Sequence, residues 1–306
     1  MAMRGHGEAL AAIRYKSAGE ATLGGADVLA DLREACEVGT GRLWVSVEGR
    51  GDCIAFYATD GLASVGRAVL FFEGDVPQGY RRDSRKLRRH LDIVRKGLES
   101  LARTYRIPYV LMARPGTFGS TGDHRQRRKM REALVMKAAV ETLSRRFGLH
   151  EVSLAGQSGG ATIAAALLTL GLTRVRCATP ASGGYDLTAM LDWHAARQGL
   201  VGNHAEHPAS IHDSFDVSQH VAGVQSDPGR RIFILGDVAD KVTPFDQQRR
   251  FAERLKASGH HAVLIEASGN GPDRHGLAAA SLEAAGMCAN GKSDAEIGKA
   301  VGRATP

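Results

Sequence analysis

The sequence has few cysteines, and they are widely spaced. The four, Cys36, Cys53, Cys177 and Cys288, form no Cys-x-x-Cys pair. We therefore expect neither a disulfide scaffold nor a cysteine-rich zinc site. Hydrophobic residues make up 43% of the 306 residues and charged residues 24%, a balance that excludes a disordered chain or a fibre.

No segment has the pattern of an export signal or a membrane span. Glu8 follows Arg4 closely, and the apolar run 9–13 is too short for a signal-peptide core, so we expect a cytoplasmic protein. Residues 152–173 carry no charge and are long enough to span a bilayer. Glycines near Ser158 would break a lipid-facing helix there, so we predict a buried strand, a tight turn and a helix of small residues.

Short apolar runs alternate with longer segments of helical periodicity. The predicted strands are residues 43–47, 54–57, 68–72, 109–112, 152–155, 175–179, 232–235 and 262–265, and the predicted helices are 84–105, 125–147, 159–170, 244–258 and 275–285. Repeated β-α-β units predict an α/β fold with a doubly wound, mostly parallel β-sheet and helices on both faces. The first two strands would form its antiparallel edge. Ser293 with Glu296 forms a capping box that predicts a short last helix.

Two regions fall outside this alternation. Residues 1–40 predict an N-terminal helical extension, and residues 186–226 are too long for a simple crossover between strands. This insertion, which contains Trp193, is a candidate lid over the carboxyl edge of the sheet. The sequence has no repeats and no low-complexity linker, so we predict one α/β domain over 41–306. It leaves the oligomeric state open, a homo-oligomer included.

A candidate nucleophile lies in the segment Gly156-Gln157-Ser158-Gly159-Gly160, which matches Gly-x-Ser-x-Gly between a predicted strand and a predicted helix. Small neighbours let strand and helix approach closely around a strained turn that lifts the serine oxygen above the sheet. The N–H of Gly159, at the helix N-terminus, is then placed to donate to an oxyanion. A Gly-rich phosphate-binding turn is the alternative interpretation.

A serine nucleophile needs a base and an acid that orients it. Asp240 and His275 follow predicted strands in the chain order serine, acid, histidine. We expect both at the carboxyl edge of the sheet, with His275 as base and Asp240 as acid. Asp237 is the alternative acid, with Asp240 then a helix cap, and His275 as a cap residue is the alternative for the histidine.

The loops after the third and fourth strands supply the other expected site residues. The third strand is followed by Glu73-Gly74-Asp75-Val76, so the N–H of Asp75 is the expected second oxyanion donor, with that of Val76 the next candidate. We expect Val76 and Gln157 to contact substrate. Arg114 is a further candidate, for a substrate carboxylate, but a structural salt bridge or loop brace is the interpretation that we favour for it.

These segments together resemble the α/β-hydrolase superfamily, most closely its prolyl-oligopeptidase-like and esterase-like members. The resemblance covers about residues 40–290 and rests on the segments Glu73-Gly74, Arg114–Ser120, Gly156–Gly160, Gly236–Asp240 with Pro244, and His275-Gly276. It implies a serine hydrolase that needs no metal or organic cofactor. Many members have His-Gly where this chain has Glu73-Gly74. No β-propeller precedes the domain, so we do not expect a peptidase of the large oligopeptidase type.

We therefore predict a serine hydrolase that cleaves a small-molecule carboxylic ester or amide through an acyl-enzyme. A peptidase or amidase of prolyl-oligopeptidase-like type shares the mechanism and is one alternative. A non-catalytic polyanion-binding protein is the other, since basic runs occur at 81–90 and 125–131. No aromatic residue interleaves with the first run, which argues against base stacking and hence against a nucleic-acid partner.

Overall fold

A sheet of eight strands forms the centre of the computed structural model, which describes residues 25–38, 41–76, 84–197 and 214–303. The strand order is β1-β2-β4-β3-β5-β6-β7-β8. The β1–β2 hairpin is antiparallel and pairs antiparallel with β4, and every later pairing is parallel. The strands are β1 (Arg42–Val47), β2 (Arg50–Ala58), β3 (Arg67–Phe72), β4 (Tyr109–Met112), β5 (Glu151–Gln157), β6 (Val175–Ala181), β7 (Arg231–Gly236) and β8 (Ala262–Glu266).

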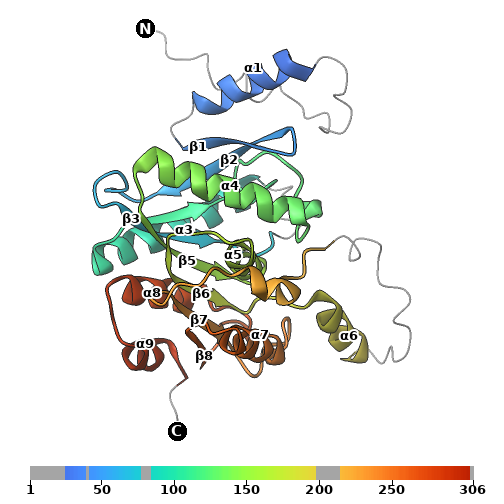
Figure 1. Ribbon diagram of the computed structural model, residues 1–306, viewed down its shortest axis with the longest axis vertical. Coiled ribbons are helices and arrows are strands. Elements are labelled where there is room, and N and C mark those ends of the chain that lie inside the picture. The colour runs from blue at the N-terminus through green and yellow to red at the C-terminus, as the bar shows by residue number, and fades with distance from the viewer. Residues whose placement is uncertain (1–24, 39–40, 77–83, 198–213, 304–306) are drawn as a thin grey trace.

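Helices cover both faces of this sheet, as Figure 1 shows. They are α1 (Gly25–Glu37), α3 (Ser84–Tyr105), α4 (Met130–Phe147), α5 (Gly159–Thr169), α6 (Leu187–Arg197), α7 (Phe245–Ala257), α8 (Ala278–Ala289) and α9 (Asp294–Val301), with 3-10 turns η1 (His124–Gln126) and η3 (Val217–Gly223). Helices α4, α5 and α7 bury side chains on one face, and α3, α8 and α9 on the other. The expected doubly wound, mostly parallel sheet is confirmed.

The strands of this sheet are apolar because both of their faces are covered. In β3 every residue from Ala68 to Phe72 is buried, so the run contains no polar alternation. All the carboxyl ends of the parallel strands meet at one edge, where the loops after β3, β5, β7 and β8 lie together.

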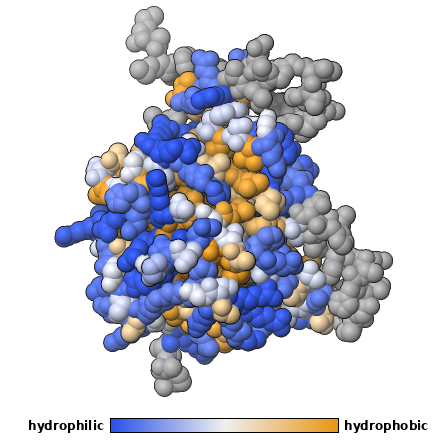
Figure 2. Space-filling model, viewed as in Figure 1, coloured by the Kyte–Doolittle hydropathy of each residue, from blue (hydrophilic) through white to orange (hydrophobic). Residues whose placement is uncertain are grey.

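The surface is hydrophilic over most of the face in Figure 2, with hydrophobic residues gathered toward the middle of the view.

Two predicted helices begin later than expected. The helix expected from residue 125 begins at Met130, because Arg128 has a positive φ of 66° and its N–H donates to the Glu132 carboxylate at 2.6 Å. The helix expected from His275 begins at Ala278, which leaves His275 in the loop before it. The last helix, α9, has the predicted capping box of Ser293 and Glu296.

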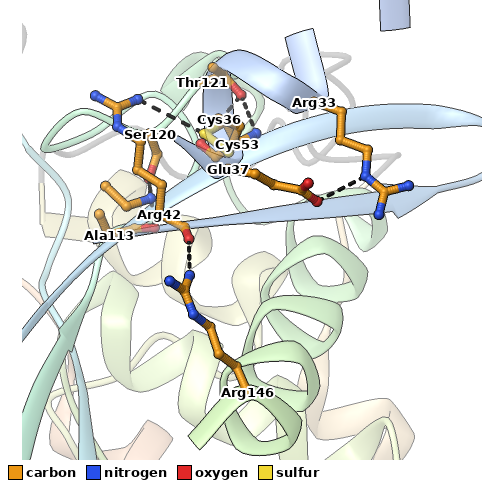
Figure 3. The surroundings of a disulfide bond; sticks show 10 residues. Arg33, Cys36, Glu37, Arg42, Cys53, Ala113, Ser120, Thr121 and Arg146 are labelled. Carbon is orange, nitrogen blue, oxygen red and sulfur yellow. Dashed lines mark hydrogen bonds and ion pairs between the residues drawn. A yellow bond between two sulfur atoms is a disulfide. The ribbon is translucent and has the colours of Figure 1, made fainter. Parts of the chain in front are cut away.

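The cysteines contradict the expectation drawn from their spacing. Cys36 is bonded to Cys53 and Cys177 to Cys288. The first bond joins α1 to β2 at the edge hairpin, where the Cys53 N–H also donates to Thr121 Oγ1 (Figure 3). The second is buried and joins β6 to α8 across 111 residues. The spacing of cysteines in a sequence reveals only pairs that are close together in the chain. These two disulfides join cysteines that the tertiary fold brings together.

Loss of the buried disulfide should lower stability strongly. We expect the Cys177→Ala/Cys288→Ala variant to lose about 3 to 5 kcal/mol of unfolding free energy, because the bond closes a long loop in the unfolded chain. Urea unfolding followed by circular dichroism measures this loss. The Cys36→Ala/Cys53→Ala variant is the comparison, with an expected smaller loss because that bond spans 17 residues. Equal stability of the first variant and the parent protein would contradict the prediction.

The two regions outside the alternation are described in part. Within 1–40 the structure describes the helix α1, and within 186–226 it describes α6, η3 and their flanks; His204 and His207 lie outside the described residues. The insertion leaves the sheet after β6 and contacts the loop after β7, where His194 Nε2 lies 2.9 Å from the Val242 carbonyl oxygen. It returns past Arg128, whose carbonyl accepts from the Phe215 N–H. Among the helices of the described residues, none has the length and apolar character needed to cross a membrane.

Candidate active site

Ser158 occupies a strained turn between β5 and α5. Its φ of 55° and ψ of −121° lie in a region that residues with a side chain rarely adopt. The glycines around it make the turn possible: a Cβ on Gly160 would lie 1.9 Å from the carbonyl oxygen of Phe72, and one on Gly156 would lie 2.4 Å from the carbonyl oxygen of Gly160. Strand and helix therefore approach as closely as the Gly-x-Ser-x-Gly pattern predicts.

The turn should not tolerate a side chain at Gly160. We expect Gly160→Ala to cost about 3 kcal/mol or more, because its Cβ would meet backbone atoms that cannot move aside cheaply. Gly97 is the matched control: it is exposed on α3, and a Cβ there meets nothing within 4 Å. Gly97→Ala should add about 0.5 to 1 kcal/mol, the usual gain from Gly to Ala in a helix. Thermal unfolding of the two variants measures both changes, and equal stabilities would refute the prediction.

His275 and Asp240 meet at the same edge of the sheet. His275 Nδ1 lies 2.9 Å from Asp240 Oδ2, and the Asp240 side chain is 1% exposed while that of His275 is 19% exposed. The other carboxylate oxygen of Asp240 accepts from the N–H groups of Val242 and Thr243. Since a carboxylate only accepts, the contact places a proton on Nδ1 of His275, and in the neutral imidazole Nε2 is then the nitrogen with the lone pair.

Gln157 ties the histidine loop to the serine turn. Its Nε2 donates to the His275 carbonyl oxygen at 2.7 Å, and its Oε1 accepts from the Leu277 N–H at 2.8 Å. Both polar ends of this side chain are thus used on the backbone on either side of Gly276. The residue that we expected to contact substrate lies buried between Ser158 and His275, and its contacts hold the two loops together.

Asp237, the alternative acid, lies in another part of the loop after β7. Its Oδ1 accepts from the Ala239 N–H, and its Oδ2 accepts from the Gly269 N–H and from Arg274 Nε. Burial raises its pKa, but these hydrogen bonds and the Arg274 charge outweigh burial and hold the pKa below its usual value. Asp237 therefore holds the residue before His275 rather than the imidazole itself.

The backbone N–H groups of Gly159 and Asp75 belong to the two segments next to Ser158. The Glu73–Asp75 loop lies against the serine, since a Cβ on Gly74 would lie 3.3 Å from the Cβ of Ser158. The N–H groups of Gly159 and Asp75 have no hydrogen-bond acceptor among the described residues. Free N–H groups beside a nucleophile are the arrangement of an oxyanion hole. Ser158 Oγ likewise has no hydrogen-bond partner within the described part of the chain.

The side chains of Arg114 and Val76 are buried. Arg114 is 1% exposed and paired with Asp75 and Glu132, which corresponds to the loop-brace interpretation. Val76 packs with Ala55, Ala113 and Phe118, and its N–H donates to His124 Nε2 at 3.3 Å. No motif pointed to Glu132, because a carboxylate at the start of a helix reads as an ordinary first-turn acid. Glu132 is buried because it pairs with the buried Arg114.

Most arginines of the basic segment 125–131 form ion pairs with acidic residues of the same chain. Arg127 and Arg128 pair with Asp75, and Arg131 pairs with Asp52. Arg125 pairs with Asp123. The first basic run continues into α3, whose residues Arg85, Lys86, Arg88 and Arg89 are exposed. Among the described residues, no group of three or more His, Cys, Asp or Glu side chains could hold a metal ion.

Comparison with known proteins finds likeness in structure alone. No family model matches the chain, and no curated protein is similar to it in sequence. An esterase from Pyrococcus furiosus is 12% identical, with 74% of this chain and 80% of that chain covered and a TM-score of 0.52. Est1E from Butyrivibrio proteoclasticus, with ferulic acid bound, is 12% identical over 73% of this chain and 88% of that chain, with a TM-score of 0.52.

A third structure has the broadest overlap of those compared here. A hydrolase of unassigned activity from Agrobacterium vitis is 16% identical over 82% of this chain and 97% of that chain, with a TM-score of 0.51. These structures confirm the expected α/β-hydrolase fold. At such identities the likeness extends to the fold, and the chemistry has to be argued from the residues of this chain.

Proposed function

We propose that the chain is a serine hydrolase in which Ser158 is the nucleophile, His275 the base and Asp240 the acid that orients it. The observation that carries the proposal is the Asp240–His275 contact at 2.9 Å, in a loop that Gln157 ties to the strained Ser158 turn. Ser158, Asp240 and His275 are distant in the sequence but lie at the same edge of the sheet. They are a serine, an acid and a histidine, the side-chain types that acyl transfer requires.

In the first half of the reaction, Ser158 Oγ forms a bond to the substrate carbonyl carbon and its proton passes to His275 Nε2. The buried Asp240 carboxylate stabilises the imidazolium that results and keeps it oriented. The negative charge moves to the carbonyl oxygen, where the N–H groups of Gly159 and Asp75 donate to it. Each donor contributes about 3 kcal/mol to transition-state stabilisation.

In the second half, the carbon–leaving group bond breaks and His275 returns the proton to the leaving group. Water then attacks the acyl-enzyme, with His275 again taking a proton, and the same donors stabilise the second tetrahedral intermediate. The bond from the acyl carbon to Ser158 Oγ breaks, and the serine regains its proton.

A carboxylic ester is the substrate class that we favour, with a small-molecule acyl group. The likeness to two esterases of the same fold supports this choice. A peptidase or amidase remains the second candidate, because the same residues would cleave an amide. The insertion contacts the loop of Asp240 and passes Arg128 on its return, so we propose that it limits which acyl groups enter.

Turnover of a matched ester and amide tests the proposal. We expect p-nitrophenyl acetate to be hydrolysed and p-nitroacetanilide to be cleaved far more slowly, because an amide has the poorer leaving group. Faster cleavage of the anilide would favour the amidase. No turnover of either substrate, together with no labelling by a fluorophosphonate, would contradict the proposed function.

The cytoplasmic location stays a prediction, and the disulfides weigh against it. Both pairs are closed in the structure, whereas most cytosolic compartments keep thiols reduced. Free thiols counted with Ellman's reagent in denatured, unreduced protein test the point. A count near zero in protein purified without oxidant supports an oxidising compartment, and a count near four supports the cytoplasm.

A further inference from the structure

The carboxylate of Asp75 belongs to a cluster of five charged side chains. Asp75 Oδ1 accepts from Arg114 Nη1 at 2.8 Å, and Asp75 Oδ2 accepts from Arg127 Nε at 3.0 Å and from Arg128 Nη2 at 2.9 Å. Glu132 completes the cluster by accepting from Arg114 Nε at 3.0 Å and from the Arg128 N–H. Its members come from the loops after β3 and β4, the segment after η1 and the helix α4.

The cluster lies directly against the serine turn. A Cβ on Gly159 would lie 2.2 Å from Asp75 Oδ1 and 2.6 Å from Arg114 Nη1, so the carboxylate and guanidinium occupy the space beside the Gly159 backbone. Arg114 Nη1 also lies 3.4 Å from the Glu73 carbonyl oxygen. The same guanidinium nitrogen thus contacts both ends of the Glu73–Asp75 loop, through a carbonyl at one end and a side chain at the other.

We propose that the Asp75 carboxylate, Arg114 and Glu132 form a clamp that positions the oxyanion-donating N–H of Asp75. The clamp rests on the proposed function. Its three side chains are positioning residues, because they act on the Asp75 backbone and do not touch substrate. Arg114 is fully buried. Its Nε donates to Glu132 and its Nη1 donates to Asp75, so hydrogen bonds to two carboxylates limit how the guanidinium plane can turn.

The arginines of the cluster also neutralise the negative charge of the Asp75 carboxylate. A lone carboxylate beside the forming oxyanion would repel it, and this repulsion is strong in a water-poor site. Here three arginines meet two carboxylates, which leaves one positive charge in excess among the five side chains. Burial raises the pKa of Asp75, but the arginines outweigh burial and hold the pKa far below its usual value. The carboxylate is therefore charged, and neutralised by its partners, whenever the reaction occurs.

Asp75→Asn tests the clamp. The variant keeps the size of the side chain but turns one oxygen into an amide nitrogen, which would face guanidinium N–H groups. We expect kcat to fall about 10- to 100-fold, as for a misplaced oxyanion donor, with KM for p-nitrophenyl acetate within about twofold of the parent value. Fluorophosphonate should still label Ser158 to the same end point, more slowly, which shows that the nucleophile remains intact.

Asp52→Asn is the matched control. Asp52 on β2 is also a buried carboxylate paired with an arginine of α4, Arg131, and among the described residues no hydrogen bond or ion pair joins it to the Glu73–Asp75 loop. A merely structural ion pair predicts similar losses of melting temperature and no loss of kcat in both variants. A kcat of Asp75→Asn within twofold of the control, or a change carried by KM alone, would overturn the proposal.

A double-mutant cycle with Arg114→Lys adds a second readout. Lysine keeps the charge but cannot contact Asp75 and Glu132 together in the planar fork. If the two side chains act as one clamp, the double variant loses little more kcat than either single variant. Fully additive losses would overturn the clamp. If the proposed function itself is wrong, the result is distinguishable: the parent protein would neither be labelled by a fluorophosphonate nor hydrolyse p-nitrophenyl acetate. The proposed role of the clamp would then be wrong as well.

Discussion

Ser158→Ala should lower kcat/KM for p-nitrophenyl acetate by about 10⁶-fold and abolish labelling by a fluorophosphonate. The reason is that the proposed covalent bond forms at Ser158 Oγ, in the strained turn between β5 and α5. The fold should survive, because alanine removes one oxygen and leaves the backbone turn unchanged. Steady-state kinetics and circular dichroism of the purified variant measure both expectations.

Ser153→Ala is the control for this substitution. Ser153 lies on β5, the strand that ends at the residue before Ser158; it is 1% exposed, and its Oγ has no hydrogen-bond partner within the described part of the chain. Removing an unpartnered buried hydroxyl costs little or stabilises, so this variant should label and turn over like the parent protein. Turnover retained by a pure Ser158→Ala preparation would end the proposed mechanism.

Asp240→Asn should lower kcat by about 10⁴-fold while leaving the loop in place. The amide oxygen can still accept from Val242 and Thr243, as Asp240 Oδ1 does, but the amide nitrogen would then face His275 Nδ1. An N–H donor at that position favours the tautomer with its proton on Nε2, where the base needs a lone pair. Steady-state kinetics on p-nitrophenyl acetate measures the loss.

Asp237→Asn separates the two candidate acids. Asp237 bonds the Ala239 and Gly269 N–H groups and Arg274, so its substitution loosens the segment before His275 without changing the tautomer. We expect a loss of about 2 kcal/mol in stability, as for a hydrogen bond to a charged group, and a fall in kcat of about 10-fold. If Asp237→Asn removed more activity than Asp240→Asn, the acid would be Asp237.

Much of this fold follows from local patterns in the sequence. Apolar runs such as 68–72 lie in strands buried on both faces, and the order of strands and helices limits how a parallel sheet can be connected. The serine turn is also local, since the glycines on both sides of Ser158 are needed for one close contact of strand and helix. Features that depend on neighbouring residues in the chain are therefore predicted well.

The errors concern contacts between distant residues. Cys177 and Cys288 are 111 residues apart, and nothing near either one shows which partner the fold will bring. The late start of α4 has the same origin, because the N–H of Arg128 donates to a Glu132 carboxylate that Arg114 holds in place. The use of Gln157 as a link between loops likewise depends on residues that only the fold brings together.

Trapping the acyl-enzyme tests the central claim most directly. The protein is mixed with p-nitrophenyl acetate, quenched with acid within the first turnovers, digested and examined by mass spectrometry. We expect one acetyl group, carried by Ser158, that disappears when the intermediate is left to react with water before quenching. An acetyl group on another residue, or turnover with no acetylated peptide and no labelling of Ser158 by a fluorophosphonate, would contradict it.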